Sequence, residues 1–330
     1  MRITVLGGGS WGTALAGLFA GQGRETTLWI READLAARIR RTRENDVYLP
    51  GIVLPAALRI EEDLPRALAG SGVQVLAVPC QFSREFLLQA RPHLPRRPVV
   101  VCASKGIEVA HLATMSQVVE ETLEGLTPTF AMLSGPSFAM EVAKGQPTAV
   151  ALGCANEAIA RELQGLLSGP MFRVYTNPDV RGVELGGALK NVMAIAVGML
   201  DGLEAGLDAR AALITRGLAE MSRLGVAMGA QERTFMGLAG MGDLVLTCTG
   251  DLSRNRTVGL ELGRGKTLAE IIASRKSVAE GVATTESMFQ LGRNYEVDLP
   301  ITAAVHAALY EDAPVRETLS RLMARTLKGE

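Results

Sequence analysis

Short apolar runs alternate with helical stretches along roughly the first half of the chain. Seven of these runs predict strands, at residues 3–7, 26–30, 73–79, 98–104, 129–135, 148–153 and 172–176. Each run is apolar at successive positions rather than at every second one, which is typical of parallel strands buried on both faces. The repeated strand–helix–strand order therefore predicts an α/β fold with a doubly wound parallel sheet.

The pattern changes near Asn177-Pro178, after which the chain shows little strand signal. Helices are expected at 179–200, 208–225, 267–273, 281–293, 300–310 and 314–327, and a glycine-rich segment at 237–250 interrupts them. A chain of 330 residues is long for one domain. We therefore expect an N-terminal domain over residues 1–178 and a C-terminal all-helical domain over residues 179–330.

Composition and charge exclude several classes of protein. The chain has 34 Lys and Arg against 35 Asp and Glu, without the basic surplus or basic tail of a nucleic-acid binder. The densest basic run, RIRRTR at 38–43, predicts the solvated face of a helix. The N-terminus lacks the features of a signal peptide, and the longest apolar run, at 192–200, is too short to span a bilayer. We therefore expect a soluble, cytoplasmic protein with no nucleic-acid partner and no membrane insertion.

Cysteine and histidine are too scattered to suggest a metal site. The four cysteines contain no CxxC pair, and the three histidines lie far apart in the sequence. Isolated cysteines in apolar stretches behave as small hydrophobic residues and suit a reducing compartment. We therefore expect no bound metal.

The segment Gly7-Gly8-Gly9-Ser10-Trp11-Gly12 has the spacing G-x-G-x-x-G. It directly follows the first predicted strand and opens a helix of small residues, which is the context that a dinucleotide site requires. Gly7 would permit the tight turn, Gly9 the approach of the pyrophosphate, and Gly12 the close packing of helix on strand. The alternative is an ordinary glycine turn. The context favours a Rossmann-type dinucleotide site, with the phosphates at the helix N-terminus.

Arg31 and Glu32 follow the second predicted strand and bear on the choice of cofactor. Sites specific for NAD usually carry an acidic residue at this point, which binds the ribose hydroxyls. Arginine can instead stack on adenine or pair with a 2′-phosphate. Arg31 therefore favours NADPH, while Glu32 leaves NAD(H) open. The alternative is that Arg31 is a solvated loop residue.

Residues 180–200 predict a helix that is buried all round, yet Lys190 and Asn191 lie in its middle. A charged lysine is rarely buried without a partner or a purpose. Burial would lower the pKa of its ammonium from about 10.4 and allow proton exchange near neutral pH. The alternative is a structural ion pair with Glu184 or with a distant aspartate.

Three further segments carry candidate ligand-binding residues. Small residues dominate 237–255, where Asp243 could pair with Lys190 and Arg254 offers a planar fork that matches phosphate. The loops at 104–106 and 135–137 each follow a predicted strand, and parallel sheets bind ligands at that edge. The alternatives are a flexible loop at 237–255 and an exposed lysine at Lys105.

The motifs GGGSWGTA, YLPG, ASKGIE, LSGPSFA, VELGGALKN, GLAGMGDLVLTCTG, SRNR and VAEGVATT occur in this order along the chain. With them the chain resembles bacterial NAD(P)-dependent glycerol-3-phosphate dehydrogenases over nearly its whole length. The resemblance implies a dinucleotide-binding Rossmann domain followed by a helical substrate-binding and catalytic domain. It also implies the interconversion of dihydroxyacetone phosphate and sn-glycerol 3-phosphate by hydride transfer with NADP or NAD, which feeds glycerophospholipid synthesis.

The resemblance implies a role for individual residues as well. Lys190 would donate and accept the proton at the C2 oxygen of the substrate. The substrate-binding positions would be Lys105, Gly135, Ser137, Asp243, Ser253, Arg254 and Asn255, with Arg254 nearest the phosphate. The cofactor-binding positions would be Gly7, Gly9, Ser10, Trp11, Gly12, Arg31, Tyr48, Lys105, Ala139, Arg254, Val278 and Glu280. Many relatives carry a second basic residue where this chain has Glu32.

Two other functions remain open on the sequence. Related two-domain dehydrogenases that act on 3-hydroxyacyl-CoA, 6-phosphogluconate or 2-keto acids share fold-level features, although the ALKN and SRN motifs argue against them. A cofactor-binding sensor without catalysis would lack a reason for the set Lys190, Asp243 and Arg254. Apolar helices of the second domain could carry a homodimer face, but no segment identifies it.

Overall fold

The computed structural model of the chain describes residues 1–273 and 279–326. These form two compact units. The first comprises Met1–Lys105 and Thr114–Glu184, and the second comprises Gly106–Ala113 and Leu185–Glu330. The predicted domain bounds, 1–178 and 179–330, stay a prediction.

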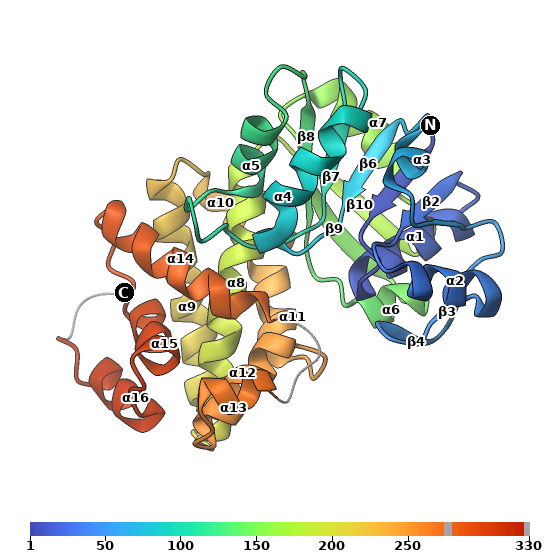
Figure 1. The fold of residues 1–330 in the computed structure, drawn as a ribbon. Coiled ribbons are helices and arrows are strands. Elements are labelled where there is room, and N and C mark those ends of the chain that lie inside the picture. Colours follow the sequence, from blue (N-terminus) through green and yellow to red (C-terminus); the bar gives the residue numbers. More distant parts are fainter. Residues whose placement is uncertain (274–278, 327–330) are drawn as a thin grey trace. The chain divides into compact units, whose positions relative to one another are not determined.

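The first unit is built on an eight-stranded sheet (Figure 1). Its strands are β1 (Ile3–Leu6), β2 (Thr26–Trp29), β5 (Arg59–Glu61), β6 (Val73–Leu76), β7 (Val99–Cys102), β8 (Thr129–Ser134), β9 (Thr148–Gly153) and β10 (Phe172–Asn177). Their order is β10-β9-β8-β7-β6-β1-β2-β5. The doubly wound α/β fold and all seven predicted strands are confirmed.

The last two strands run opposite to the others. β9 pairs with β8 in antiparallel fashion, and β10 is parallel to β9. The predicted parallel sheet is therefore mostly parallel, and the β8–β9 pair is the exception. The link from β8 to β9 holds only a five-residue helix, α6 (Ala139–Ala143), which is shorter than the crossover helices that usually return a parallel strand.

Sequence patterns missed three short strands in the first unit. β5 has three residues, two of them charged, and therefore shows no apolar run. β3 (Glu44–Asn45) and β4 (Leu49–Val53) form a separate antiparallel hairpin. β3 and β5 are too short and too polar for a pattern to identify them, whereas the Pro and Gly within β4 are typical of a turn rather than a strand.

Helices flank the sheet of the first unit (Figure 1). They are α1 (Ser10–Gly21), α2 (Ala33–Thr42), α3 (Leu64–Leu68), α4 (Cys80–Ala90), the 3₁₀ turn η1 (Arg91–His93), α5 (Met115–Thr122), α6 and α7 (Glu157–Leu167). α2 and α7 are amphipathic and bury only one stripe of residues. α5 begins with a capping box, in which Thr114 and Gln117 satisfy each other's backbone N–H groups.

The described elements of the second unit are helices, apart from the segment Gly106–Ala113, which is a turn closed by an isolated bridge between Glu108 and Ala113. The helical elements are α8 (Val180–Gly202), which starts in the first unit, α9 (Leu207–Ala227), α10 (Glu232–Phe235), the π-helical turn η2 (Leu238–Gly242), α11 (Asp243–Thr249), α12 (Arg254–Gly263), α13 (Leu268–Ala273), α14 (Glu280–Asn294), α15 (Pro300–Tyr310) and α16 (Val315–Met323). All six helices predicted for this region are present. The segment 237–250 was expected to interrupt the helices, and this expectation is wrong because the segment is almost entirely helical.

Helix α8 is the centre of the second unit's apolar core. It packs against α12 through glycines, since a Cβ at Gly198 would lie 2.0 Å from the Arg256 carbonyl oxygen and one at Gly259 would lie 1.9 Å from that of Ile195. With 23 residues and a mean hydropathy of 1.4 over its most apolar stretch, α8 could cross a bilayer by length and composition, but that stretch is wholly buried in the structure.

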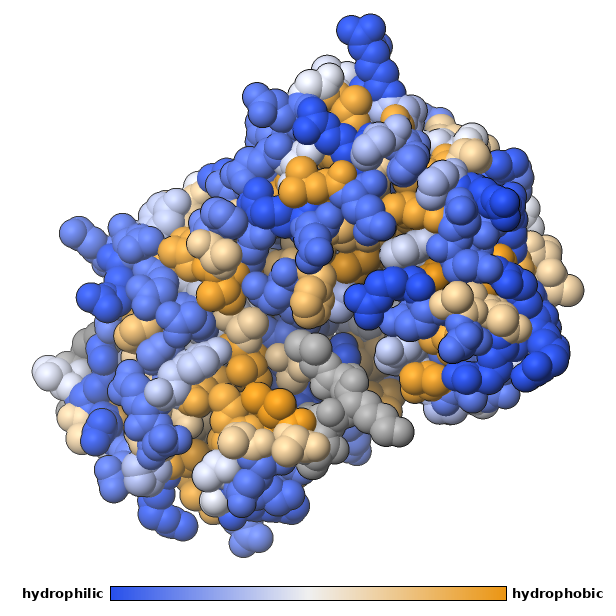
Figure 2. Space-filling view, in the orientation of Figure 1, coloured by the Kyte–Doolittle hydropathy of each residue, from blue (hydrophilic) through white to orange (hydrophobic). Residues whose placement is uncertain are grey.

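The face shown in Figure 2 is mainly hydrophilic, with apolar residues in smaller groups.

Candidate active site

The glycine loop between β1 and α1 has the tight geometry that its spacing predicts. Gly7 has φ +124°, and a Cβ there would lie 2.7 Å from the Ala77 carbonyl oxygen. A Cβ at Gly12 would lie 2.0 Å from the Gly7 carbonyl oxygen, so only glycine lets the helix start this close to the strand. At Gly9 an added Cβ would meet no heavy atom within 4 Å. The loop is therefore packed on one side and open at Gly9.

The start of α1 provides donors that a dinucleotide could use. No side chain among the described residues caps its N-terminus, so its first backbone N–H groups are available to an anion. The Trp11 indole Nε1 is buried without a hydrogen-bond partner in the described part of the chain. A buried donor of this kind is costly unless something binds it. These features fit a dinucleotide whose pyrophosphate lies at the start of α1.

Tyr48 is hydrogen-bonded to this loop, whereas Arg31 is exposed and pairs with Glu32. The Ser10 Oγ, on the first residue of α1, donates to the Tyr48 carbonyl oxygen at 2.6 Å, which ties the β3–β4 hairpin to the loop. Arg31 follows β2, its side chain is 80% exposed, and it pairs with the Glu32 carboxylate at 3.1 Å. Glu32 therefore offsets part of the charge that Arg31 would present to a 2′-phosphate.

Lys105, Gly135 and Ser137 come together at one backbone carbonyl. The Lys105 Nζ donates to the Gly135 carbonyl oxygen at 3.1 Å, and the Ser137 Oγ donates to the same oxygen at 2.9 Å. Gly135 has φ +142°, and a Cβ there would lie 2.9 Å from the Val150 Cα. The loops after β7 and β8 thus place these predicted substrate residues side by side. Ala139 follows as the first residue of α6.

Lys190, Asp243 and Thr247 form a buried polar cluster in the second unit. The Lys190 Nζ donates to the Asp243 Oδ1 and, at 2.7 Å, to the Thr247 Oγ1. Lys190 is 6% exposed and Asp243 is 1% exposed. The Asp243 carboxylate favours the charged ammonium, in opposition to the effect of burial. Lys190 therefore pairs with an aspartate that is distant in the sequence, and Glu184 instead accepts hydrogen bonds from Ser116.

Local packing explains why these residues meet. A Cβ at Gly186 of α8 would lie 2.6 Å from the Ala239 carbonyl oxygen, and one at Gly240 would lie 2.1 Å from that of Phe235. Gly186 therefore lets the π-helical turn η2 lie directly against α8, and Gly240 lets the same turn pack against the end of α10. Such turns often occur at functional sites. Asp243 then starts α11, and Thr247 follows one turn later on the same helical face. Thr247 was not among the predicted site residues, although its spacing from Asp243 was a usable signal.

Ser253, Arg254 and Asn255 open helix α12. Ser253 is its N-cap and accepts from the Arg256 N–H at 3.2 Å. Arg254 is exposed at the first helical position. The buried Asn255 donates to the Asn191 Oδ1 at 3.0 Å and accepts from the Gly281 N–H at 2.9 Å, so it joins α8, α12 and α14. Glu280 is the first residue of α14. Val278, predicted to contact cofactor, lies outside the described residues.

Glu184 is a buried carboxylate on α8 that the sequence did not assign to a site. It accepts from the Ser116 N–H at 2.7 Å and from the Ser116 Oγ at 2.6 Å. Burial raises the pKa of the Glu184 carboxyl from 4.5 to about 7, although both hydrogen bonds act to lower it. The raised pKa means that folding favours the protonated acid. This stabilisation is complete below about pH 4.5 and is lost as the pH rises through 7.

We expect Glu184→Gln to remove this pH dependence. Glutamine is neutral and can both accept from the Ser116 N–H and donate to its hydroxyl. Relative to the variant, the wild-type free energy of unfolding should fall by about 3 kcal/mol between pH 4.5 and pH 8. Denaturant unfolding at several pH values measures this difference in the free energy of unfolding. Glu120→Gln, at an exposed position on α5, is the control. Parallel pH profiles for wild type and Glu184→Gln would contradict the assignment.

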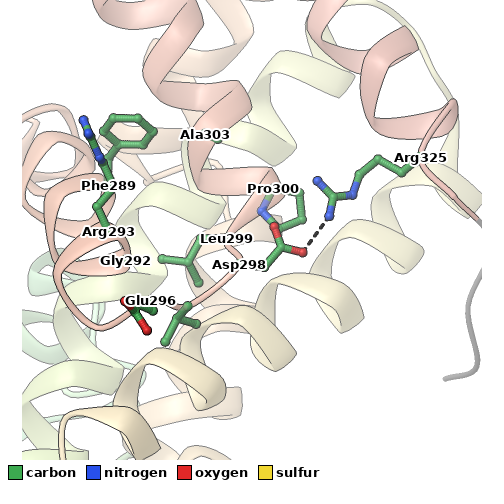
Figure 3. A pocket seen from close by; sticks show the side chains of 10 residues that line it. Phe289, Gly292, Arg293, Glu296, Asp298, Leu299, Pro300, Ala303 and Arg325 are labelled. Atoms are coloured by element: carbon green, nitrogen blue, oxygen red, sulfur yellow. Dashed lines mark hydrogen bonds and ion pairs between the residues drawn. The ribbon is translucent and has the colours of Figure 1, made fainter.

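Two further features of the described residues concern metal binding and a pocket. Among residues 1–273 and 279–326, no group of three or more His, Cys, Asp and Glu side chains could hold a metal ion. The second unit has a pocket of about 340 Å³, lined by Phe289, Gly292, Arg293, Glu296, Val297, Asp298, Leu299, Pro300, Ala303 and Arg325. Figure 3 shows Arg325 paired with Asp298 there, at 2.6 Å. None of the predicted site residues lines this pocket.

Comparison with known proteins places this set of residues in a family. Residues 2–160 match the N-terminal part, and residues 179–320 the C-terminal part, of the NAD-dependent glycerol-3-phosphate dehydrogenase family. Glycerol-3-phosphate dehydrogenases [NAD(P)+] of Oleidesulfovibrio alaskensis and Solidesulfovibrio magneticus are 57% and 55% identical, over 100% of both chains in each case. The crystal structure of glycerol-3-phosphate dehydrogenase from Coxiella burnetii is 39% identical with a TM-score of 0.94, covering 98% of this chain and 99% of that one. The chain therefore belongs to the NAD-dependent glycerol-3-phosphate dehydrogenase family.

Proposed function

We propose that this protein interconverts dihydroxyacetone phosphate and sn-glycerol 3-phosphate by hydride transfer with NADPH or NADH. The observation that carries the proposal is the buried Lys190, held by Asp243 and Thr247, in a chain of this family. A lysine in an apolar helix is costly to bury, and acid–base chemistry on a ketone supplies a reason for it.

The reaction needs a proton and a positive charge at the ketone oxygen. The nicotinamide supplies the hydride when the cofactor is bound, and negative charge develops on the C2 oxygen as the carbonyl carbon accepts it. We assign Lys190, in the ammonium form that Asp243 favours, to stabilising this charge and donating a proton to the oxygen. In the opposite direction the neutral amine takes the proton back from the C2 hydroxyl. Thr247 fixes the direction of the Nζ.

The remaining polar residues are assigned to binding the substrate and its phosphate. Arg254 offers a bidentate fork at the start of α12, where the helix N-terminus also favours an anion. Lys105 and Ser137, gathered at the Gly135 carbonyl, provide a second set of donors. The Asn255 amide uses one hydrogen for Asn191 and has a second for a substrate oxygen. A phosphate bound away from the reacting carbon supplies binding energy that orients the ketone.

We expect Arg31→Ala to lower kcat/KM for NADPH about tenfold and to change kcat/KM for NADH much less. The reason is that Arg31 is the cation placed for a 2′-phosphate, which NADH lacks. Glu32→Gln should shift the preference toward NADPH, because it removes the carboxylate now paired with Arg31. Arg41→Ala, at an exposed arginine of α2, is the control. Equal losses with both cofactors would show that Arg31 does not select between them.

The direct test is oxidation of NADPH or NADH, followed at 340 nm, with dihydroxyacetone phosphate as the substrate. Turnover with this ketone and little with unphosphorylated dihydroxyacetone would support both the reaction and the phosphate contact. No turnover with either cofactor would refute the proposal. Turnover of a 2-keto acid instead would move the chain to a related reductase, and cofactor binding without any turnover would indicate a sensor.

The proposal extends to the setting of the enzyme. We infer a cytoplasmic enzyme without membrane insertion, whose product feeds glycerophospholipid synthesis, and a homodimer formed through the helical unit. Deletion of the gene should then create a requirement for glycerol unless a second source of glycerol 3-phosphate exists. Light scattering of the purified protein would measure its oligomeric state.

A further inference from the structure

The β3–β4 hairpin is bonded to the glycine loop through Asn45, which is wholly buried, with 0% of its surface exposed. Its Nδ2 donates to the Gly8 carbonyl oxygen at 2.9 Å and to the Thr13 Oγ1 at 2.8 Å. Its Oδ1 accepts from the Tyr48 N–H at 3.1 Å. Both amide hydrogens and the amide oxygen are therefore engaged, which fixes the orientation of this side chain.

The bond to Gly8 also fixes the peptide that joins Gly8 to Gly9. In a trans peptide the carbonyl and the N–H of the next residue point in opposite directions. Asn45 and the Thr13 hydroxyl, at 3.3 Å, hold the Gly8 carbonyl on the buried side. The Gly9 N–H must then point away from that side. Gly9 is the loop residue at which an added Cβ would meet no heavy atom within 4 Å.

Two further contacts hold the loop in this conformation. The Ser10 Oγ donates to the Tyr48 carbonyl oxygen at 2.6 Å, so the hairpin is bonded to the loop both at Gly8 and at Ser10. On the other side a Cβ at Gly8 would lie 2.9 Å from the Ile30 side chain, so the loop is packed closely at this position and only glycine fits there. The hairpin is thus a fixed support for the part of the loop that faces the phosphates.

We propose that Asn45 is a positioning residue for dinucleotide binding, which holds the Gly8–Gly9 peptide with its N–H directed to the pyrophosphate. The inference rests on the proposed function only in so far as a dinucleotide binds at this loop. A backbone donor that is already oriented loses no freedom when the anion arrives, and this preorganisation increases affinity. Asn45 acts through the backbone of the loop and does not itself touch the cofactor.

The test compares Asn45→Ala and Asn45→Asp with a control variant, Gln74→Ala. Asn45→Ala removes both donors, and Asn45→Asp keeps the shape but places a carboxylate oxygen against the Gly8 carbonyl. Gln74 is another buried amide of the same unit, 1% exposed, whose Nε2 donates to Ser71 and not to the loop. We expect Gln74→Ala to lower the free energy of unfolding about as much as Asn45→Ala does, while the contacts of the glycine loop stay in place.

We expect the Kd for NADPH, measured by nicotinamide fluorescence without substrate, to rise about tenfold or more in both Asn45 variants. The KM for NADPH should rise in parallel, while kcat at saturating NADPH and the KM for dihydroxyacetone phosphate stay near wild type. Gln74→Ala should bind NADPH with the wild-type Kd, even if its unfolding midpoint falls as far as that of the Asn45 variants.

Two outcomes would overturn the inference. One is wild-type affinity for NADPH in Asn45→Ala, and the other is an equal loss of affinity in Gln74→Ala, which would mean that lowered stability alone weakens binding. The fluorescence titration is independent of the substrate. If the wild type binds NADPH but does not reduce dihydroxyacetone phosphate, the proposed function fails, and the binding comparison still decides the role of Asn45.

Discussion

Replacing Lys190 should lower kcat by about 10³- to 10⁴-fold while leaving the affinity for NADPH near the wild-type value. The lysine is assigned both the proton and the positive charge at the C2 oxygen, so its loss removes two sources of transition-state stabilisation. The residues assigned to the dinucleotide loop are untouched by the change, which is why cofactor binding should persist.

The choice of variant matters because Asp243 is buried beside the lysine. Lys190→Met would leave that carboxylate without its ion-pair partner, and the loss of one member of a buried pair costs about 3–5 kcal/mol of stability. Lys190→Arg avoids this, since the guanidinium keeps the positive charge next to Asp243. Arginine stays protonated at all working pH values and therefore cannot deliver the proton. We expect Lys190→Arg to fold, to bind NADPH and to show the same large loss of kcat.

Two threonines of α11 give a matched comparison. Thr247→Val removes a hydroxyl bonded to the Lys190 Nζ at 2.7 Å, and we expect about a tenfold lower kcat. The hydroxyl of the exposed Thr249 donates to the Val245 carbonyl oxygen, so Thr249→Val should have little effect on kcat.

A kcat of Lys190→Arg within tenfold of the wild-type value would contradict the assignment of Lys190 to the proton transfer.

The main elements of the fold could be predicted because apolar residues dominate them. Most strands of the sheet are largely apolar, and the exceptions are β5, with its charged ends, and β10, in which buried and exposed residues alternate. Helix α8 could be placed for the same reason, and the lysine in its middle stood out against the apolar background. A residue that breaks a strong pattern is visible without a structure.

Segments whose form depends on distant packing could not be predicted. The glycines of 237–250 disfavour a helix by intrinsic propensity, yet the segment is almost entirely helical, and it is packed so closely that a Cβ at Gly240 would lie 2.1 Å from the Phe235 carbonyl oxygen. Asn45 gave no signal either, since an isolated asparagine before YLPG is typical of a turn. Its partners Gly8 and Thr13 lie more than 30 residues earlier in the chain.

Arg254→Ala is expected to lower kcat/KM for dihydroxyacetone phosphate by about 10²- to 10³-fold, chiefly through KM. The guanidinium lies at the first position of α12, where Ser253 caps the helix and the N-terminal dipole favours an anion. A bidentate arginine bond to phosphate is charge-assisted and about twice as strong as a neutral hydrogen bond. Arg254→Lys should recover only part of the loss, because an ammonium cannot reproduce the planar fork.

The unphosphorylated ketone separates a phosphate contact from a general defect. Dihydroxyacetone lacks the group that Arg254 is proposed to bind, so its low kcat/KM should change little in Arg254→Ala. Equal losses for both ketones would instead place Arg254 at the cofactor, where it was also predicted to contribute, and the Kd for NADPH would then rise as well.

Arg256 provides a control on the same helix turn. Its guanidinium is engaged by the Asp201 carboxylate at 2.7 Å and by the Asp251 carboxylate at 3.0 Å, so its charge is already matched within the protein. Arg256→Lys keeps that charge and should leave kcat/KM for the phosphorylated ketone within about threefold of the wild type. If Arg256→Lys were as damaging as Arg254→Ala, the conformation of the α12 N-terminus, rather than one arginine, would bind the phosphate. A large effect confined to Arg254 and to the phosphorylated substrate is the result that only a direct contact explains.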